Sequence, residues 1–178
     1  MDSNYGLSIV KDYPIKGVNF IDINGLLATP KYFTAVIEQF AETIKNTLPA
    51  EILGKAAILS PESRGFIFGA PVAAKLGLPL LLIRKNGKIP NRPYIFRITN
   101  EYSTYDMEMD GDLLAAHDNF IYIDDVLASG QTLASVRKAV AKKGKKVLLA
   151  MHLTAVAALK NARDENADLK GLSIKEII

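Results

Sequence analysis

Short continuous runs of apolar residues alternate along the chain with longer segments in which apolar residues recur every three or four positions. The short runs are typical of strands covered on both faces, and the longer segments of helices that bury one face. Strands are predicted at 56–60, 78–83, 120–124 and 146–151. Helices are predicted at 30–48, at 65–77 and between the last two strands. Strands that alternate with helices indicate an α/β fold with a central parallel sheet and right-handed crossovers.

The segment from Arg84 to Asp112 interrupts this alternation. A loop-like stretch, RKNGKIPNRP, precedes two runs at 94–98 and 105–109 that have the character of antiparallel strands. We expect this hairpin to project from the core and to form a lid. Beyond the last predicted strand the pattern weakens to a helix at 155–163 and a final SIKEII.

Composition limits the possible functions. The chain has 178 residues, 49% of them hydrophobic, which suits one domain with a sizeable core. A net charge of +3 is too small to indicate nucleic acid, and the lysines around Gly144 are typical of a helix end. The absence of cysteine excludes disulfides and thiolate metal sites, and the two histidines, His117 and His152, are interpreted as structural.

No secretory signal is visible at the N-terminus, and no apolar run approaches the length of a membrane span. We therefore expect a cytoplasmic protein without a membrane partner.

The segment FIYIDDVLASGQT, residues 120–132, carries the chemistry. Ligands of parallel sheets bind beyond the carboxyl ends of the strands, where this segment is expected. Small residues that lead into a helix expose backbone N–H groups, and Gly130 permits a phosphate to approach closely. Asp124 and Asp125 can accept hydrogen bonds from vicinal hydroxyls or hold a hydrated Mg²⁺. The segment fits a ribose 5-phosphate better than the alternative, an acidic turn with a helix cap.

Two other phosphate motifs are missing. No G-x-x-x-x-G-K-[ST] occurs, which argues against a nucleoside-triphosphatase loop, and no G-x-G-x-x-G follows a strand.

FIYIDDVLASGQT resembles the phosphoribosyl-pyrophosphate (PRPP) signature of type I phosphoribosyltransferases. Four further segments are similar, in the same order, to those of the adenine phosphoribosyltransferase family: YPIKGVNFIDI, ESRGFIFG, IRKNGKIP and NEYSTYDMEM. The resemblance implies a type I phosphoribosyltransferase fold in a single domain, 1–178, whose central parallel sheet is flanked by helices. A small hood (about 1–30 plus part of the C-terminus) and a lid hairpin (about 91–109) would complete it.

The implied reaction is purine salvage, in which adenine and PRPP give AMP and pyrophosphate with Mg²⁺ as cofactor. The resemblance assigns the 5-phosphate to a loop formed by Ala128, Ser129, Gly130, Gln131 and Thr132. It assigns the ribose hydroxyls and metal-bound water to Asp124 and Asp125.

The pyrophosphate would meet Glu62, Ser63 and Arg64, with a cis peptide bond between Glu62 and Ser63. Lys88 would reach the pyrophosphate of the neighbouring subunit in a homodimer, supported by Arg84 and Lys85. On their own, these three cations would be interpreted as a solvated basic loop.

Adenine would stack on Phe20, while backbone groups of Asn19 and Ile21 bind its edge. Glu101, with Tyr102 beside it, would be the catalytic residue of the lid, because a protonated carboxyl group near N7 assists attack by N9. Glu108 is a weaker candidate, since YDMEM has the pattern of a strand.

Two alternatives stay open at this point. One is transfer to hypoxanthine, xanthine or guanine, and ASGQT also resembles the loop of xanthine phosphoribosyltransferases. The other is a PRPP- or nucleotide-sensing regulator without catalytic activity.

Overall fold

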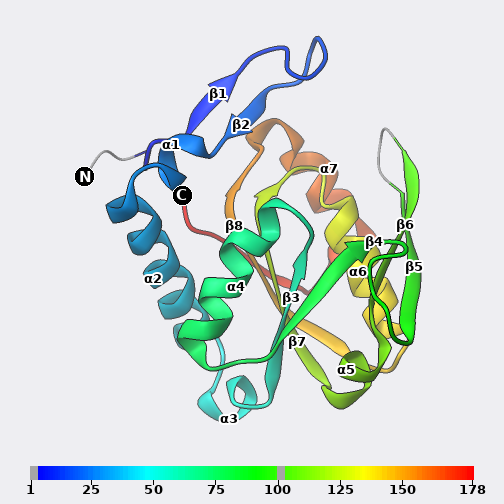
Figure 1. The fold of residues 1–178 in the computed structure, drawn as a ribbon. Helices are drawn as coiled ribbons and strands as arrows, with labels where there is room; N and C mark the ends of the chain where they lie inside the picture. Colours follow the sequence, from blue (N-terminus) through cyan, green and yellow to red (C-terminus); the bar gives the residue numbers. More distant parts are fainter. Residues whose placement is uncertain (1–3, 100–102) are drawn as a thin grey trace.

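The computed structural model describes residues 4–99 and 103–178 (Figure 1). Seven strands form one sheet in the order β5-β6-β4-β3-β7-β8-β9. Strands β4, β3, β7, β8 and β9 are parallel, whereas β6 pairs antiparallel with both β4 and β5. Their bounds are β3 Ala56–Pro61, β4 Leu80–Lys85, β5 Pro93–Thr99, β6 Thr104–Asp110, β7 Asn119–Leu127, β8 Lys146–Ala155 and β9 Ser173–Glu176.

Helices cover both faces of this sheet. Helices α2 (Pro30–Thr47) and α4 (Arg64–Leu76) pack on one face, and α6 (Gln131–Ala141) packs on the other. Strand β7 contributes side chains to both layers of the core. Ile121 and Ile123 pack on the side of α2 and α4, while Phe120 and Tyr122 pack on the side of α6. This alternation explains why the strand appears as an uninterrupted apolar run in the sequence.

Shorter elements connect these layers. They are α1 Asn24–Leu27, α3 Ala50–Leu53, α5 Gly111–Ala116, the 3₁₀ turns η1 Ala157–Leu159 and η2 Ala167–Leu169, and α7 Lys160–Glu165. The sequence pattern did not predict α1, α3 or α5, because four to six residues are too few for a helical period to show. Strands β1 (Ser8–Val10) and β2 (Phe20–Asp22) form a separate antiparallel pair, which we call the N-terminal arm (residues 8–22).

The main predicted strands and helices are confirmed, and several boundaries differ, among them the end of β8, which lies at Ala155 rather than at 151. Strand β7 runs three residues beyond the predicted end at Asp124, because Asp124 and Val126 pair with His152 and Thr154 of β8. The helix predicted at 155–163 is instead η1 followed by α7, which ends at Glu165. The lysines near Gly144 do follow the end of α6, as predicted.

The predicted hairpin is present and antiparallel, but it belongs to the main sheet. Phe96, Ile98, Met107 and Met109 are buried in the core against α6 and its neighbours. Most of the expected lid is therefore anchored, and residues 100–102 of that segment lie outside the described residues.

The carboxyl ends of the parallel strands point toward the N-terminal arm (Figure 1). No helix within the described ranges is long and apolar enough to cross a membrane.

His152 is buried in β8, with only 1% of its surface exposed. Burial, aided by the positive charge of Arg163, lowers its pKa to about 3. The unfolded chain takes up a proton near the ordinary pKa of about 6.5, whereas the folded chain does not. The contribution of His152 to stability is therefore complete above that pH and decreases as the pH falls toward 3.

We expect His152→Leu to remove this part of the pH dependence. Between pH 6.5 and 4, the stability of the wild type relative to the variant should fall by up to about 1.4 kcal/mol per pH unit. Urea unfolding at several pH values measures this difference. Parallel profiles for the two proteins would contradict the prediction.

Candidate active site

Two neighbouring cavities open at the carboxyl ends of β3, β4 and β7. The larger has a volume of about 800 Å³, and the smaller, of about 120 Å³, lies under the loop that follows β7. Asp124 and Thr132 line both. The other predicted site residues in the larger cavity are Glu62, Ser63, Arg64, Lys85 and Asp125, and those in the smaller one are Ala128, Ser129, Gly130 and Gln131.

The loop Ala128–Gly130 joins β7 to the first turn of α6. Gly130 is the N-cap residue and has a left-handed backbone, with φ of +83°. The first-turn amides of a helix have no partner within the helix, and the helix dipole adds positive potential there. The loop and helix therefore have the geometry that suits an anion, the ligand that the sequence predicts for this loop.

Asp124 and Asp125 are adjacent residues of β7 with different surroundings. Asp124 accepts hydrogen bonds from the Tyr122 hydroxyl at 2.9 Å and from the Asp125 amide at 2.9 Å. Burial of the Asp124 carboxyl group, together with the negative charge of Asp125, raises its pKa to about 8. Asp125 is 7% exposed and forms an ion pair with Arg64. At neutral pH the Asp124 carboxyl group therefore keeps its proton, beside the ion pair of Asp125 with Arg64.

Arg64 connects three parts of the site. Its Nε pairs with Asp125, and its Nη2 donates to the Ile21 carbonyl at 2.9 Å. The guanidinium carbon lies 5.0 Å from the centre of the Phe20 ring, within the range of a cation–π contact. Arg64 therefore ties the Asp125 carboxylate to the N-terminal arm.

The peptide bond between Glu62 and Ser63 corrects one expectation. Within the described residues only Tyr13–Pro14 is cis, so the Glu62–Ser63 bond is trans, contrary to the prediction. The unusual backbone lies one bond further on, because Ser63 has φ of +78° and ψ of −95°. A residue with a side chain adopts such a conformation only where its surroundings enforce it. Ser63 is the N-cap of α4 and lines the larger cavity.

Two glutamates, Glu62 and Glu108, bind the end of β4 and the basic loop that follows it. Arg84 Nε lies 3.5 Å from Glu62, and the Lys85 amide donates to the same carboxylate at 3.1 Å. Glu108 is 1% exposed and accepts hydrogen bonds from the amides of Lys88 and Ile89. Its burial would raise its pKa, but these amides and that of Gly87 outweigh the effect and lower it. Glu108 therefore supports the loop as an ionised carboxylate.

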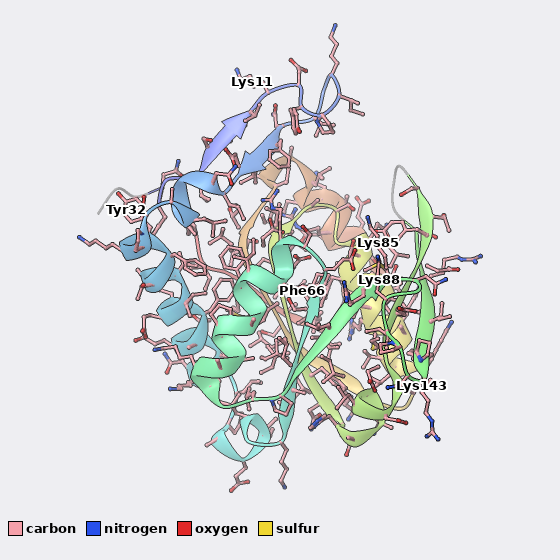
Figure 2. All side chains as sticks on the ribbon, viewed as in Figure 1. Lys11, Tyr32, Phe66, Lys85, Lys88 and Lys143 are labelled. Carbon is pink, nitrogen blue, oxygen red and sulfur yellow. The ribbon has the colours of Figure 1, made fainter. Side chains whose placement is uncertain are left out.

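Side chains of the basic loop reach different surroundings. Figure 2 labels Lys85, the last residue of β4, and Lys88, on the loop that follows it. Lys85 lines the larger cavity, whereas Lys88 is exposed and does not line it, and neither does Arg84.

Asn19 and Ile21 line a separate cavity of about 320 Å³ between the N-terminal arm and residues 154–158. Phe20, the third residue predicted to hold the base, is half-buried and packs edge-on against Tyr13 at 5.3 Å between ring centres. Glu101 and Tyr102 lie outside the described residues.

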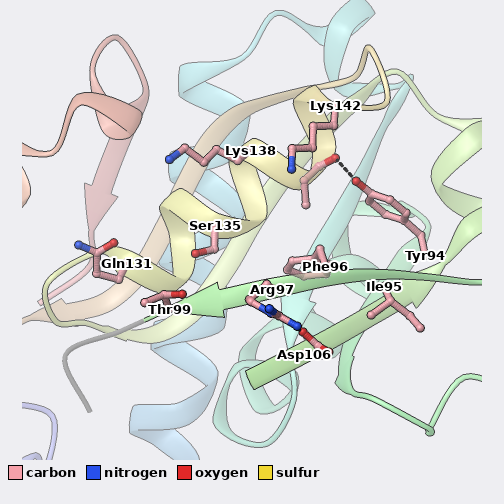
Figure 3. Close-up of a pocket in the computed structure, with 11 residues that line it drawn as sticks. Tyr94, Ile95, Phe96, Arg97, Thr99, Asp106, Gln131, Ser135, Lys138 and Lys142 are labelled. Carbon is pink, nitrogen blue, oxygen red and sulfur yellow. Dashed lines mark hydrogen bonds and ion pairs between the residues drawn. The ribbon is translucent and has the colours of Figure 1, made fainter. Parts of the chain in front are cut away.

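A further pocket of about 640 Å³ lies between β5 and α6 (Figure 3). Among the predicted site residues it contains only Gln131, and the Tyr94 hydroxyl donates across it to the Ala139 carbonyl at 3.0 Å. Two of its cations, Arg97 and Lys138, are paired with Asp106 and Asp168. We therefore place the candidate active site in the cavities at the ends of β3, β4 and β7.

Three residues near the site were not singled out for it from the sequence. Tyr122 donates to Asp124, His152 lines the smaller cavity, and Arg163 donates to the loop after β7. Tyr122 and His152 lie in apolar runs and Arg163 in a polar helix, so only the fold brings them to the site.

The chain is similar over most of its length to known proteins of one family. Residues 22–177 match the phosphoribosyl transferase domain family. The chain is 37% identical over 163 residues to the adenine phosphoribosyltransferase of Mycoplasma mobile, covering 92% of this chain and 91% of that protein. The crystal structure of adenine phosphoribosyltransferase from Thermoanaerobacter pseudethanolicus is similar with a TM-score of 0.84 at 32% identity, covering 97% and 95% of the two chains. The structure of the Giardia lamblia enzyme complexed with 9-deazaadenine gives a TM-score of 0.84 at 29% identity, covering 97% and 92%.

Gly130→Ala tests the loop. A Cβ atom at Gly130 would lie 2.6 Å from Leu169 Cδ1, and the φ of +83° disfavours any side chain. We expect a loss of about 1–3 kcal/mol in the free energy of unfolding and at least about tenfold weaker AMP binding, measured by calorimetry.

Gly144→Ala is the matched control. Gly144 has a φ of +72°, but no atom lies within 4 Å of the added Cβ. This variant should lose stability and keep its AMP affinity. Equal affinities for AMP in the wild type and a folded Gly130→Ala protein would exclude the loop from phosphate binding.

Proposed function

The chain belongs to the adenine phosphoribosyltransferase family, and we propose that it transfers the phosphoribosyl group of PRPP to adenine, giving AMP and pyrophosphate. It is a glycosyltransferase of purine salvage. The observation that carries the residue assignment is the convergence of the anion loop, Asp124, Asp125 and Arg64 on adjoining cavities. These groups match the phosphate, the ribose hydroxyls and the pyrophosphate of one substrate.

PRPP would lie across both cavities. The amides of the loop, with the hydroxyls of Ser129 and Thr132, would bind the 5-phosphate, and the carboxyl groups of Asp124 and Asp125 would accept from the ribose hydroxyls. Arg64, Lys85 and the backbone at Ser63 line the larger cavity, where the pyrophosphate would lie. A guanidinium presents paired donors that suit phosphate oxygens.

Adenine would bind beside the N-terminal arm, against Phe20 and the backbone of Asn19 and Ile21. Arg64 donates a hydrogen bond to the Ile21 carbonyl and faces the Phe20 ring. Movement of Arg64 toward the pyrophosphate would therefore free both groups for the base.

Magnesium is the expected cofactor. No group of three acidic, histidine or cysteine side chains within the described ranges could hold a metal ion unaided. Asp124 and Asp125 alone suit an ion that takes most of its ligands from PRPP and water, with these carboxylates binding its water. When bound, the ion would supply positive charge to the pyrophosphate leaving group.

We further propose a cytoplasmic homodimer. Two observations support a dimer. Lys88 is exposed on a loop whose backbone is bound by Glu108, and it does not line the cavity of its own chain. A two-fold arrangement would let this lysine reach the partner's pyrophosphate site. Sedimentation that shows a fully active monomer would refute it.

The proposed function is tested by incubating the protein with PRPP, Mg²⁺ and each of adenine, hypoxanthine, xanthine and guanine. AMP formation should exceed formation of the other nucleotides. Preference for another base would leave the reaction class in place and exclude adenine, and the absence of any nucleotide product would favour a regulator.

Glu101 is the proposed general acid, on the evidence of the sequence. Protonation at N7 of adenine, or a hydrogen bond to it, eases loss of the N9 proton as N9 attacks the ribose carbon. We expect Glu101→Leu to lower kcat by about 100-fold or more, with little change in PRPP affinity. Steady-state kinetics with AMP detection measure both, and a near-normal kcat would leave Glu101 without a chemical role.

A further inference from the structure

The segment that follows β8 lies directly behind the anion loop. Arg163 of α7 donates from Nη1 to the Ala128 carbonyl at 2.8 Å and to the Val156 carbonyl at 2.8 Å. A longer contact of 3.4 Å joins the same nitrogen to the Leu127 carbonyl. One cation thus binds the last residue of β7, the first residue of the loop and the residue after β8.

These contacts determine which way the loop amides point. A peptide unit is planar and trans, so its C=O and N–H bonds point in opposite directions. The Ala128 carbonyl shares its peptide unit with the Ser129 amide. Because Arg163 holds that carbonyl on its own side, the Ser129 amide is turned to the opposite side. No hydrogen bond joins the amides of Ser129 or Gly130 to another residue within 4–99 and 103–178.

Leu169 of η2 supports the same loop from this segment. A Cβ atom on Gly130 would lie 2.6 Å from Leu169 Cδ1 and 3.7 Å from Arg163 Cγ, so both side chains pack closely against the glycine. The loop therefore has little room to rotate its peptide units toward the C-terminal segment.

Arg163 forms no ion pair with a carboxylate of the described residues. None of the ion pairs among the described residues includes Arg163, and the neighbouring Asp164 pairs with Lys160 at 2.9 Å. A guanidinium bound only to carbonyl oxygens keeps its full charge, and this charge adds positive potential at the loop.

We propose that Arg163 is a positioning residue for the 5-phosphate, which orients the amide of Ser129 and adds positive charge behind the loop. This inference rests on the proposed function and assigns a role to the C-terminal segment, η1 to η2. Arg163 acts through the loop and does not touch the substrate.

A purely structural role for Arg163 makes a different prediction, and Arg137 provides the control. Arg137 of α6 donates from Nη1 to the carbonyls of Asp168 and Lys170 at 2.6 and 3.0 Å. It anchors the same C-terminal segment by the same chemistry, but it binds no carbonyl of the loop. If Arg163 only fixed that segment, loss of either arginine would have a similar effect.

The experiment compares Arg163→Met with Arg137→Met in the full chain. Calorimetry measures the affinity for ribose 5-phosphate, which requires the loop, and for pyrophosphate, which is assigned to Arg64 and its neighbours. We expect Arg163→Met to weaken ribose 5-phosphate binding by about tenfold or more, the scale of a charge-assisted hydrogen bond. Pyrophosphate binding should change less than about twofold. Arg137→Met should change neither affinity comparably.

Amide chemical shifts and kinetics give independent readouts. The ¹H–¹⁵N signals of Ala128 and Ser129 should move in Arg163→Met and stay in place in Arg137→Met. The KM for PRPP should rise more than kcat falls. Arg163→Lys keeps the positive charge but loses the planar guanidinium, and it replaces the methionine variant if that variant does not fold. Its affinity for ribose 5-phosphate should lie below that of the wild type.

Two results would overturn the inference: equal loss of ribose 5-phosphate affinity in Arg163→Met and Arg137→Met, or unchanged affinity in a folded Arg163 variant. Both leave the proposed function intact as long as the wild type forms AMP. A wild type that binds ribose 5-phosphate but forms no AMP would instead contradict the proposed function.

Discussion

The ion pair between Arg64 and Asp125 is the interaction on which the candidate site depends. The side chain of Asp125 is 10% exposed, and a carboxylate with so little water needs a nearby cation. Arg64 supplies it and also holds the Ile21 carbonyl and the Phe20 ring. A substrate that attracts Arg64 must therefore satisfy Asp125 by other donors, and ribose hydroxyls can do this. In the proposed assignment, the ribose, pyrophosphate and base sites would be coupled through the Arg64 side chain.

The fold was largely predictable because its strands are buried on both faces. Continuous apolar runs such as 120–124 can be recognised without knowledge of their neighbours, and the order of strands and helices then fixes where the loop after β7 lies. The local pattern failed where pairing decides the structure. The apolar run predicted that the strand ends at Asp124, yet pairing with β8 extends it to Leu127.

The contacts that tune the site could not be predicted for a related reason. Glu108 binds the amides of a loop about 20 residues earlier in the chain, and Arg163 binds a carbonyl 35 residues earlier. Such hydrogen bonds depend on tertiary structure and leave no periodicity or spacing in the sequence. The backbone at Ser63 illustrates the same limit, because its positive φ belongs to a residue type that ordinarily avoids it.

The two carboxyl groups of β7 carry the electrostatic argument one step further. Two adjacent acids in a poorly hydrated strand end repel each other, and a single arginine neutralises only one of them. Asp124 accordingly keeps its proton near neutral pH because of its burial and the charge of Asp125, although the hydrogen bond donated by the Tyr122 hydroxyl works against this. Hydroxyl groups of a ligand that donate to Asp124 stabilise its ionised form and lower its pKa. Binding of a ribose at this strand would therefore be linked to loss of the Asp124 proton. The neutral carboxyl group would become a carboxylate that accepts hydrogen bonds from the ribose hydroxyls.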